Sequence, residues 1–449
     1  MHYYDLRAGR VPLPAPAPGY DPAGDAAHLF PTGLSSPATS PISGLQILDS
    51  LGEGHRFVVR IPDDWNGDLI ACGTPATRSE FANDAIFGDF ALARGYAFAS
   101  SNKGIPYNAT VEAVCVTPDP TLAYPVPFDA NGMRELGLVV RFGALWPKAI
   151  SVRAWHEDLA KLIVAAKAHV RTAKGREPKR TFALGLSNGG GQVRYLLERS
   201  PELVDGGVEW AGVYWSAEDN ILSYLPRFLQ LMPQYVRSGY RDKDVHDAIV
   251  ASGFPPDRLQ EVPGHRSLWD DHYANLVPHY ADLTTFLFAL LLDPRAESWV
   301  GPNPNVPNPV SGARGGGPLN ATALALPAAR ADYVPSPEAK SAIGDFAFSG
   351  ALERPLVGIA GTADVFITPQ HHAAPYLDAV RSAGRADRYR QFLVDGGPHV
   401  DAYVAYGYGL RPQLPFAWRA FDLMLAMVEG ESLERREDAA LISDPSDIR

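Results

Sequence analysis

The sequence feature that most constrains the fold is the pentapeptide Gly185-Leu186-Ser187-Asn188-Gly189, which lies between an apolar run and a helix-forming stretch. A serine in a tight turn from a strand into a helix adopts a strained backbone conformation, and its neighbours must lack Cβ atoms so that strand and helix can approach. Such a turn exposes the serine Oγ at the positive end of the helix. The pattern predicts a strand, a sharp turn and a helix, with Ser187 as a candidate nucleophile. The alternative is a glycine-rich turn in which Ser187 has no chemical role.

The chain around this turn alternates between short apolar runs and longer stretches with helical spacing. Alternation of this kind is typical of a mostly parallel sheet whose crossover helices flank it, which places the chain in the α/β class. The helix predicted before the turn carries apolar residues at helical spacing from Leu159 to Val170, and Gly175 ends it. The predicted strands are residues 55–61, 69–72, 96–100, 181–184, 207–213, 354–360 and 389–394, and the predicted helices are residues 83–94, 151–173, 188–199, 370–383 and 415–429.

The alternation is interrupted twice, and each end of the chain departs from it. Residues 102–150 form a long, proline-rich excursion within the alternating part, and loops of that length are usually functional or disordered. We predict a core of residues 46–215 and 346–430, a largely helical lid insertion of residues 216–345, an irregular N-terminal arm of residues 1–45 and a charged, loose C-terminal tail of residues 431–449.

Composition excludes several classes of protein. Acidic residues (51) outnumber Lys and Arg (40), so the formal charge is −11, whereas a nucleic-acid-binding protein needs a basic surface. No uninterrupted apolar run is long enough to span a bilayer, so no membrane partner is expected. The N-terminus has no basic region followed by an apolar stretch. We therefore expect a cytoplasmic protein as the sequence stands, or a secreted or periplasmic one if an export signal has been removed.

Neither the cysteines nor the clustered acids and histidines match a metal signature. Cys72 and Cys115 are too few for a disulfide scaffold or a cysteine-rich zinc module, and Cys72 lies in an apolar run, where a small core residue is expected. The run Asp270-Asp271-His272 with His279 has no defined ligand spacing. We expect no metal and no cofactor.

A serine nucleophile needs a histidine base, and the histidine needs a carboxylate that fixes its tautomer. For a serine nucleophile on a turn of this kind, the expected chain order is serine, acid, histidine. His399 follows the last predicted strand, at the kind of strand end where chemistry gathers in open α/β sheets. Asp364 follows the strand before it and is the candidate acid. Asp219 is a rival, and Asp395 is disfavoured because it lies too close in sequence to His399.

An ester carbonyl under attack also needs donors for its oxyanion. The backbone N–H of Asn188, which follows the nucleophile, is one candidate. The second donor is expected from the loop after residues 69–72, where Thr74 and Ala76 are the candidates because Pro75 has no N–H.

These motifs together resemble the α/β-hydrolase superfamily and, within it, the tannase and feruloyl-esterase group. The resemblance covers residues 46–215 and 346–430. It is carried by Trp65-Asn66-Gly67, Trp155-His156-Glu157-Asp158, Ser187-Asn188-Gly189-Gly190 with Gln192, and the run from Ser200 to Gly206. The departures are Leu186 and Pro398, which stand where that group has two bridged cysteines, and the lack of a carboxylate cluster matching its lid calcium site.

The resemblance implies a serine esterase that cleaves a carboxylic ester through an acyl-enzyme. The expected partner is a small-molecule or oligomeric ester, either an aromatic or bulky hydrophobic ester or a hydroxyacid oligomer. Residues 185–192 also resemble the elbow of homoserine-type acyltransferases, so an acyltransferase using the same triad is a second hypothesis. A third hypothesis is a non-catalytic binding protein built on this fold.

Overall fold

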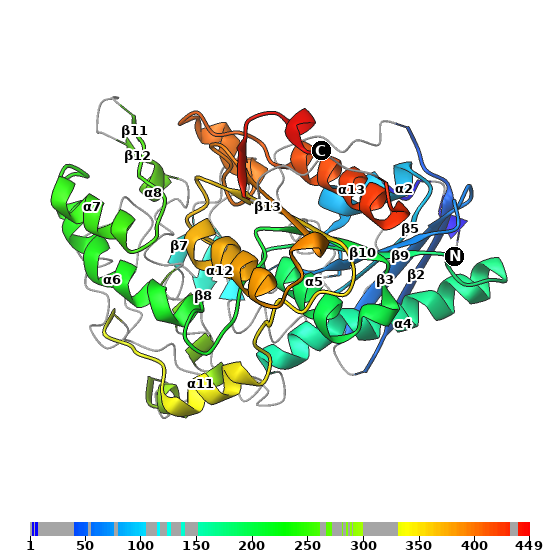
Figure 1. Cartoon of the computed structure of the whole chain (residues 1–449), viewed down its shortest axis with the longest axis horizontal. Coiled ribbons are helices and arrows are strands. Elements are labelled where there is room, and N and C mark those ends of the chain that lie inside the picture. The colour runs from blue at the N-terminus through cyan, green and yellow to red at the C-terminus, as the bar shows by residue number, and fades with distance from the viewer. Residues whose placement is uncertain are drawn as a thin grey trace.

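The structure is a computed structural model (Figure 1). It describes residues 2–3, 5–7, 40–52, 55–75, 80–104, 115–116, 124–126, 136–139, 151–260, 266–271, 281, 284–285, 288–289, 291–299, 331–431 and 439–449.

Within these residues one large sheet forms the centre of the molecule, with ten strands in the order β1-β2-β3-β5-β4-β9-β10-β13-β14-β15. From β5 to β15 every neighbouring pair is parallel, whereas β1, β2 and β3 join the sheet in antiparallel pairs. The strands are β1 (His2–Tyr3), β2 (Gly44–Ser50), β3 (Arg56–Pro62), β4 (Leu69–Gly73), β5 (Ala97–Ser101), β9 (Thr181–Leu186), β10 (Gly206–Trp210), β13 (Leu356–Gly361), β14 (Tyr389–Val394) and β15 (Ala440–Ile442).

Helices cover both faces of this sheet (Figure 1). On one face α4 packs against α5, and Arg194 of α5 lies over the ring of Tyr376 of α12. On the other face Phe90 of α2 stacks on Trp418 of α13 at 5.6 Å. The helices are η1 (Asp84–Gly88), α2 (Asp89–Ala93), α4 (Val152–Lys174), α5 (Asn188–Arg199), α12 (Pro369–Ser382) and α13 (Leu414–Glu429). The predicted α/β class is confirmed.

The helix before the nucleophile turn shows why the sequence pattern succeeds. Ser151 caps α4 by accepting a hydrogen bond from the N–H of Ala154, and Gly175 ends it in the left-handed conformation, with φ of 72°. The predicted apolar side from Leu159 to Val170 is buried. Both ends therefore lie within one residue of the predicted range, because cap residues and periodicity are local signals.

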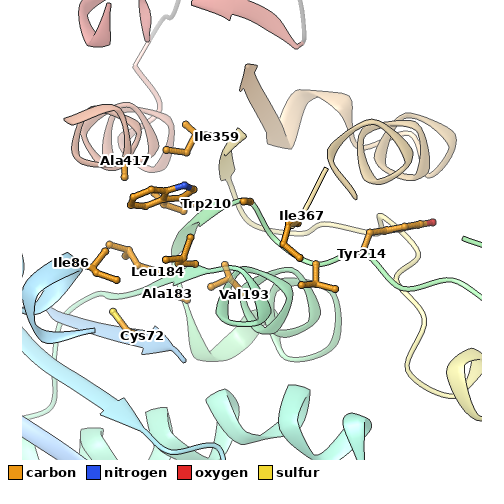
Figure 2. Close-up of a cluster of buried hydrophobic side chains, with 14 of the residues drawn as sticks. Cys72, Ile86, Ala183, Leu184, Val193, Trp210, Tyr214, Ile359, Ile367 and Ala417 are labelled. Carbon is orange, nitrogen blue, oxygen red and sulfur yellow. The ribbon is translucent and has the colours of Figure 1, made fainter. Parts of the chain in front are cut away.

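The core lies on both sides of the strands. Figure 2 shows the indole of Trp210 in β10 directed toward α13, near Ala417, while Val193 of α5 lies on the opposite side with Tyr214 and Ile367. Cys72 is a buried, free thiol in this core, as expected, and burial raises its pKa well above the usual value. Because β9 and β13 are buried on both faces, their sequences are nearly continuous apolar runs.

The segment between β10 and β13, which we predict to be a lid, is mainly helical where it is described. Its parts are α6 (Ile221–Arg237), α7 (Lys243–Ala251), β11 (Leu259–Gln260), β12 (Arg266–Ser267), α8 (Leu268–Asp271), η3 (Pro294–Trp299) and α11 (Pro337–Gly344). Two aspartates tie its pieces together: the half-buried Asp257 accepts hydrogen bonds from Tyr235 and Ser267, and the buried Asp293 accepts one from Tyr333. The histidines at 272 and 279 lie outside the described residues.

Three sequence expectations differ from the structure. The predicted loose tail includes β15, which pairs with β14, and Ile448 is fully buried. The predicted irregular arm includes β1, and Leu6 packs in the core. The excursion holds three short strands that pair in the order β6-β8-β7: β6 (Cys115–Val116), β7 (Tyr124–Val126) and β8 (Leu136–Val139). The pairing partners of β1 and β15 are distant in sequence, so no local pattern marks these two strands. No helix among the residues described is long and apolar enough to cross a membrane.

Candidate active site

Ser187 occupies the turn between β9 and α5 in a strained conformation, with φ of 60° and ψ of −122°. Positive φ is uncommon outside glycine, and such a conformation costs about 1–3 kcal/mol unless the surroundings enforce it. Two hydrogen bonds extend the sheet through this residue: its N–H donates to the carbonyl of Trp210 at 2.9 Å, and its carbonyl accepts from the N–H of Val213 at 3.1 Å. The sharp turn that the sequence predicts is therefore present, and Ser187 is buried with 6% exposure.

The glycines around Ser187 allow three backbones to meet. A Cβ on Gly185 would lie 2.2 Å from the carbonyl oxygen of Gly189, and a Cβ on Gly189 would lie 2.2 Å from that of Gly73. A Cβ on Gly190 would lie 2.7 Å from the Cα of Gly212. These atoms are backbone and have little freedom to move aside, so β4, β9 and α5 approach each other only because these positions lack side chains.

The first oxyanion candidate is in a suitable position. Asn188 is the first residue of α5, where a backbone N–H has no acceptor within the helix. The positive end of the helix dipole adds to the field at this point. The N–H of Asn188 can therefore serve a developing negative charge beside Ser187.

The candidates for the second oxyanion donor, Thr74 and Ala76, are not placed in the same way as Asn188. The N–H of Thr74 donates to Oε1 of Gln192 at 2.9 Å, in a fully buried contact. This N–H is used within the protein, which argues against Thr74 as an oxyanion donor. Pro75 has no N–H, and Ala76 lies outside the described residues. Sequence reasoning missed this because the bond joins residues 118 positions apart.

The candidate acid and base are joined directly. Nδ1 of His399 is 2.7 Å from Oδ2 of Asp364, and both side chains are buried. The other oxygen of Asp364, Oδ1, accepts the backbone N–H groups of Phe366 and Ile367, both at 2.9 Å. The carboxylate is thereby fixed by its own loop and directs Oδ2 at the imidazole. An ionised Asp364 accepts from Nδ1–H, so the remaining nitrogen, Nε2, is free to accept a proton.

Other side chains hold the loops on which Asp364 and His399 lie. The ring of Phe366 packs edge-on against the imidazole of His399 at 5.3 Å. Side-chain Nε2 of Gln413 donates to the carbonyl of Pro398, the residue before His399. Asp401, two residues after His399, accepts the N–H groups of Gln413 and Leu414 at 2.6 and 2.9 Å. Burial raises the pKa of Asp401 to about 7, against the effect of these two bonds.

The rival acids have no such arrangement. Asp219 is exposed in a turn with Ser216, and Asp395 is half-buried and uses its backbone groups to bind Arg411 and Ile442. Among the described contacts, neither carboxylate is bonded to a histidine of the C-terminal loops.

Ser187, Asp364 and His399 follow the carboxyl ends of β9, β13 and β14, respectively. These strands are parallel and, with β10, adjacent in the sheet, in register from Leu186 through Trp210 and Ile359 to Phe392. All three residues therefore lie at the same edge of the sheet, where ligands bind in open α/β folds.

A second histidine lies beneath the acid loop. Nδ1 of His372 accepts the N–H of Tyr214 at 3.0 Å, and its Nε2 is 2.7 Å from the hydroxyl of Tyr224 on α6. That hydroxyl is also 3.2 Å from the carbonyl of Phe366, which it can donate to. Burial, with nearby His371 and Arg194, lowers the pKa of His372 well below the usual value. His372 is thus a neutral link between α6 and the loop of Asp364, a role that we did not predict.

Below the turn of Ser187 lies a buried ion pair. Nη2 of Arg194 donates to Oε1 of Glu209 at 2.6 Å, and the hydroxyl of Tyr389 donates to the same oxygen at 2.6 Å. Oε2 of Glu209 accepts the N–H of Gly212 at 2.7 Å. Buried charges remain ionised only when paired and hydrogen-bonded, and this pair joins α5 to β10 and β14.

Asp158 of the Trp155-His156-Glu157-Asp158 run also lies inside the protein. Asp158 accepts a hydrogen bond from Ser101 and pairs with Nε2 of His55. Lys103 is buried nearby, with its ammonium 5.0 Å from the ring centre of Trp155, and burial lowers its pKa to about 7. His156 is buried among aromatic rings, and burial lowers its pKa to about 4. Across the residues that the structure describes, no group of three acids, histidines or cysteines is arranged to hold a metal ion.

No family model matches the sequence, and no curated protein matches it significantly. Among solved structures, the chain is similar to feruloyl esterase B from Aspergillus oryzae, with 14% identity, a TM-score of 0.47, and coverage of 88% of this chain and 82% of that chain. It is similar to tannin acyl hydrolase from Aspergillus niger, with 13% identity, a TM-score of 0.43, and coverage of 90% and 80%. It is also similar to an acylaminoacyl peptidase from Pyrococcus horikoshii, with 11% identity, a TM-score of 0.40, and coverage of 91% and 44%.

These likenesses concern the fold, and the proteins named include both esterases and a peptidase. The order of the parallel strands and the strained serine turn agree with the predicted α/β fold. They do not separate an ester from an amide as the substrate.

Proposed function

We propose that this protein is a serine hydrolase that cleaves carboxylic esters through an acyl-enzyme, with Ser187 as nucleophile, His399 as base and Asp364 as the residue that orients the base. The observation that carries the proposal is the buried hydrogen bond between Asp364 and His399, at the same edge of the sheet as the strained Ser187. A fixed carboxylate, an imidazole with one free nitrogen and a serine at a helix start are the parts that acyl transfer needs.

In the proposed reaction, Nε2 of His399 takes the proton of the Ser187 hydroxyl as Oγ attacks the ester carbonyl. The oxyanion that forms is stabilised by the N–H of Asn188 and by a second donor from the loop after β4. The imidazolium then gives its proton to the leaving alcohol as the carbon–oxygen bond breaks, which leaves an acyl group on Oγ. A water molecule, deprotonated by the same nitrogen, then attacks the acyl carbonyl. The bond to Oγ breaks to release the acid, and the imidazolium returns its proton to Oγ of Ser187.

Asp364 supports this cycle without being protonated itself. Its Oδ2 holds Nδ1–H of His399, so the basic nitrogen always faces away from the carboxylate. Its Oδ1 is held by two backbone N–H groups, which keeps the carboxylate from rotating as the imidazole gains and loses charge.

The direct test is hydrolysis of a graded series of p-nitrophenyl acyl and aryl esters, with the matching p-nitroanilides as amide substrates. We expect ester turnover by the wild type and a loss of at least about 10⁴-fold in kcat for Ser187→Ala. The matched control is Ser341→Ala, because Ser341 is an exposed helical serine in α11. Equal ester turnover by wild type and Ser187→Ala would refute the proposal.

The same assay separates the alternatives. Product analysis with added alcohols shows whether the acyl group goes to water or to an acceptor, as the acyltransferase hypothesis requires. Turnover of the anilides in preference to the esters would identify a peptidase. Failure of a fluorophosphonate to label Ser187 would favour the non-catalytic binding protein.

A further inference from the structure

The peptide group that joins Gly73 to Thr74, where β4 ends, is held at both of its polar atoms. The carbonyl of Gly73 accepts a hydrogen bond from Nδ2 of Asn83 at 3.1 Å. The N–H of Thr74 donates to Oε1 of Gln192 at 2.9 Å. A peptide group fixed at both ends cannot rotate about its flanking bonds, so its plane is set by two side chains from other elements.

Gln192 is suited to this position by having both an acceptor and a donor. It lies on α5, five residues after the nucleophile, and is 1% exposed. While its Oε1 accepts from Thr74, its Nε2 donates to the carbonyl of Trp155 on α4 at 2.6 Å. A carboxylate could not donate and an ammonium could not accept, so among long side chains only an amide joins these two backbones. The helix that carries Ser187 thereby also fixes the end of β4.

Asn83 holds the other end in the same way. It is fully buried, and its Nδ2 donates to Oγ of Ser100 at 3.0 Å as well as to Gly73. The side chain of Thr74 adds a third restraint through its hydroxyl, which donates to the carbonyl of Ser101. Gly73 itself lies against Gly189, where a Cβ would be 2.4 Å from the Gly189 carbonyl oxygen.

The position of this peptide group links the restraint to Ser187. It lies at the carboxyl end of β4, next to β9, against the turn that carries Ser187. The chain continues from it into Pro75 and then into the loop from which the second oxyanion donor is expected. A small rotation of the Gly73–Thr74 peptide would change the direction in which the chain leaves β4 at Pro75, and displacements of about 1 Å can cost on the order of 10²-fold in rate.

We propose that Gln192 and Asn83 are positioning residues for oxyanion binding: by clamping the Gly73–Thr74 peptide, they set the direction in which the chain leaves β4 at Pro75. The inference rests on the proposed function, because only a reaction with a developing oxyanion makes the direction of this loop matter. Neither residue takes part in the chemistry, and both act through the backbone that they hold.

The experiment compares wild type with Gln192→Met and Asn83→Leu, which keep volume and remove the hydrogen bonds. Each is assayed with a p-nitrophenyl ester and with the thionoester in which sulfur replaces the carbonyl oxygen. Sulfur is a weak hydrogen-bond acceptor, so a well-placed oxyanion site favours the ester over the thionoester. We expect kcat for the ester to fall about 10- to 100-fold in each variant, KM to stay within about 3-fold, and the ester-to-thionoester ratio of kcat to fall about 10-fold.

The double variant sharpens the test. Because both side chains act on one peptide group, their effects on kcat should be far from multiplicative, with the double variant close to the weaker of the two single variants. The matched control is Gln391→Met: Gln391 is also buried, but it lies within β14, away from its carboxyl end. It should leave the ester-to-thionoester ratio unchanged.

Three results would overturn the inference. One is an unchanged kcat in both single variants. Another is a reduced kcat with an unchanged ester-to-thionoester ratio, which would mean that the clamp only supports the fold. Should one variant fail to fold, the other still decides, because each holds a different end of the same peptide. The third result is that the wild type shows no ester turnover dependent on Ser187. That result would refute both the proposed function and this inference. The first two results would refute only this inference and leave the proposed function intact.

Discussion

The nucleophile side and the acid–base side of the candidate site are built by different means. Ser187 is fixed by shape: Gly73, Gly185 and Gly189 bring backbones into contact, and each leaves no room for a Cβ. Asp364 and His399 are fixed by polar bonds, through two backbone N–H groups and one contact between carboxylate and imidazole. The turn of Ser187 should therefore be disrupted by substitutions that add volume. The pair of Asp364 and His399 should be disrupted by substitutions that exchange a charge or a donor at constant volume.

The sharpest way to test the polar side is Asp364→Asn, which preserves shape. The amide can place an N–H opposite Nδ1 of His399, which favours the wrong tautomer and removes the negative charge that stabilises the imidazolium. We expect kcat to fall about 10⁴-fold with little change in the free energy of unfolding. Kinetics on the nitrophenyl ester and urea denaturation measure the two quantities.

The control for this variant is Asp219→Asn, which exchanges the same groups at the exposed rival position. Its kcat should equal that of wild type. If Asp219→Asn lost activity and Asp364→Asn kept it, the assignment of the acid would be wrong.

The shape-dependent side is tested by Gly189→Ala. Its Cβ would lie 2.2 Å from the Gly73 carbonyl oxygen, so β4 and α5 must separate. We expect the free energy of unfolding to fall by about 3 kcal/mol, even though alanine favours a helix by about 1 kcal/mol. Urea denaturation checks this value.

Gly344→Ala in α11 is the matched control, since a Cβ there meets open space. It should be neutral or stabilising by up to about 1 kcal/mol. Equal stabilities for the two variants would contradict the steric account of the serine turn.

The two sides also share a sensitivity to acid, because each has a buried neutral histidine. His156 lies beside Gly191 of α5 with its pKa lowered by burial to about 4, and the pKa of His372 near the acid loop is lowered as well. The unfolded chain binds protons at these residues below about pH 6.5, whereas the folded protein does not, so stability falls as the pH drops.

We expect the wild type to lose about 1.4 kcal/mol of unfolding free energy per pH unit for each such histidine, between about pH 6 and pH 4. The variant His156→Phe places an aromatic ring beside Phe346 and Phe348. It should reduce the slope by the contribution of one histidine, about 1.4 kcal/mol per pH unit. Urea titrations at several pH values measure the slope. Identical slopes in wild type and variant would show that His156 does not contribute.

Features encoded by neighbouring residues could be predicted from the sequence. The serine turn and α4 with its two caps follow from local patterns. Asp364 and His399 were chosen because each follows a predicted strand, and the structure places these two residues in contact. The end of β10 was predicted three residues too late, because Ala211 takes a positive φ that no local apolar pattern reveals.

Features that depend on distant contacts could not be predicted. The hydrogen bond of Gln192 to Thr74 spans 118 residues, and Tyr224 reaches His372 across 148. An amide or hydroxyl that meets a distant backbone leaves no period or spacing in the sequence. The sequence therefore indicated Gln192 only as part of a motif that resembles a family. It did not indicate that the side chain binds the backbone of Thr74.

The strand β15 has a consequence for solubility. It pairs with Phe392–Val394, and the N–H of Asp395 donates to the carbonyl of Ile442, so β14 is an interior strand up to the point where the histidine loop begins. Without residues 440–442, β14 would present a row of unpaired amides and carbonyls flanked by Phe392 and Val394. Open edges of this kind recruit strands from other molecules and lead to aggregation. A few residues from a stretch that is otherwise highly charged thus keep the protein's last long strand from becoming a template for self-association.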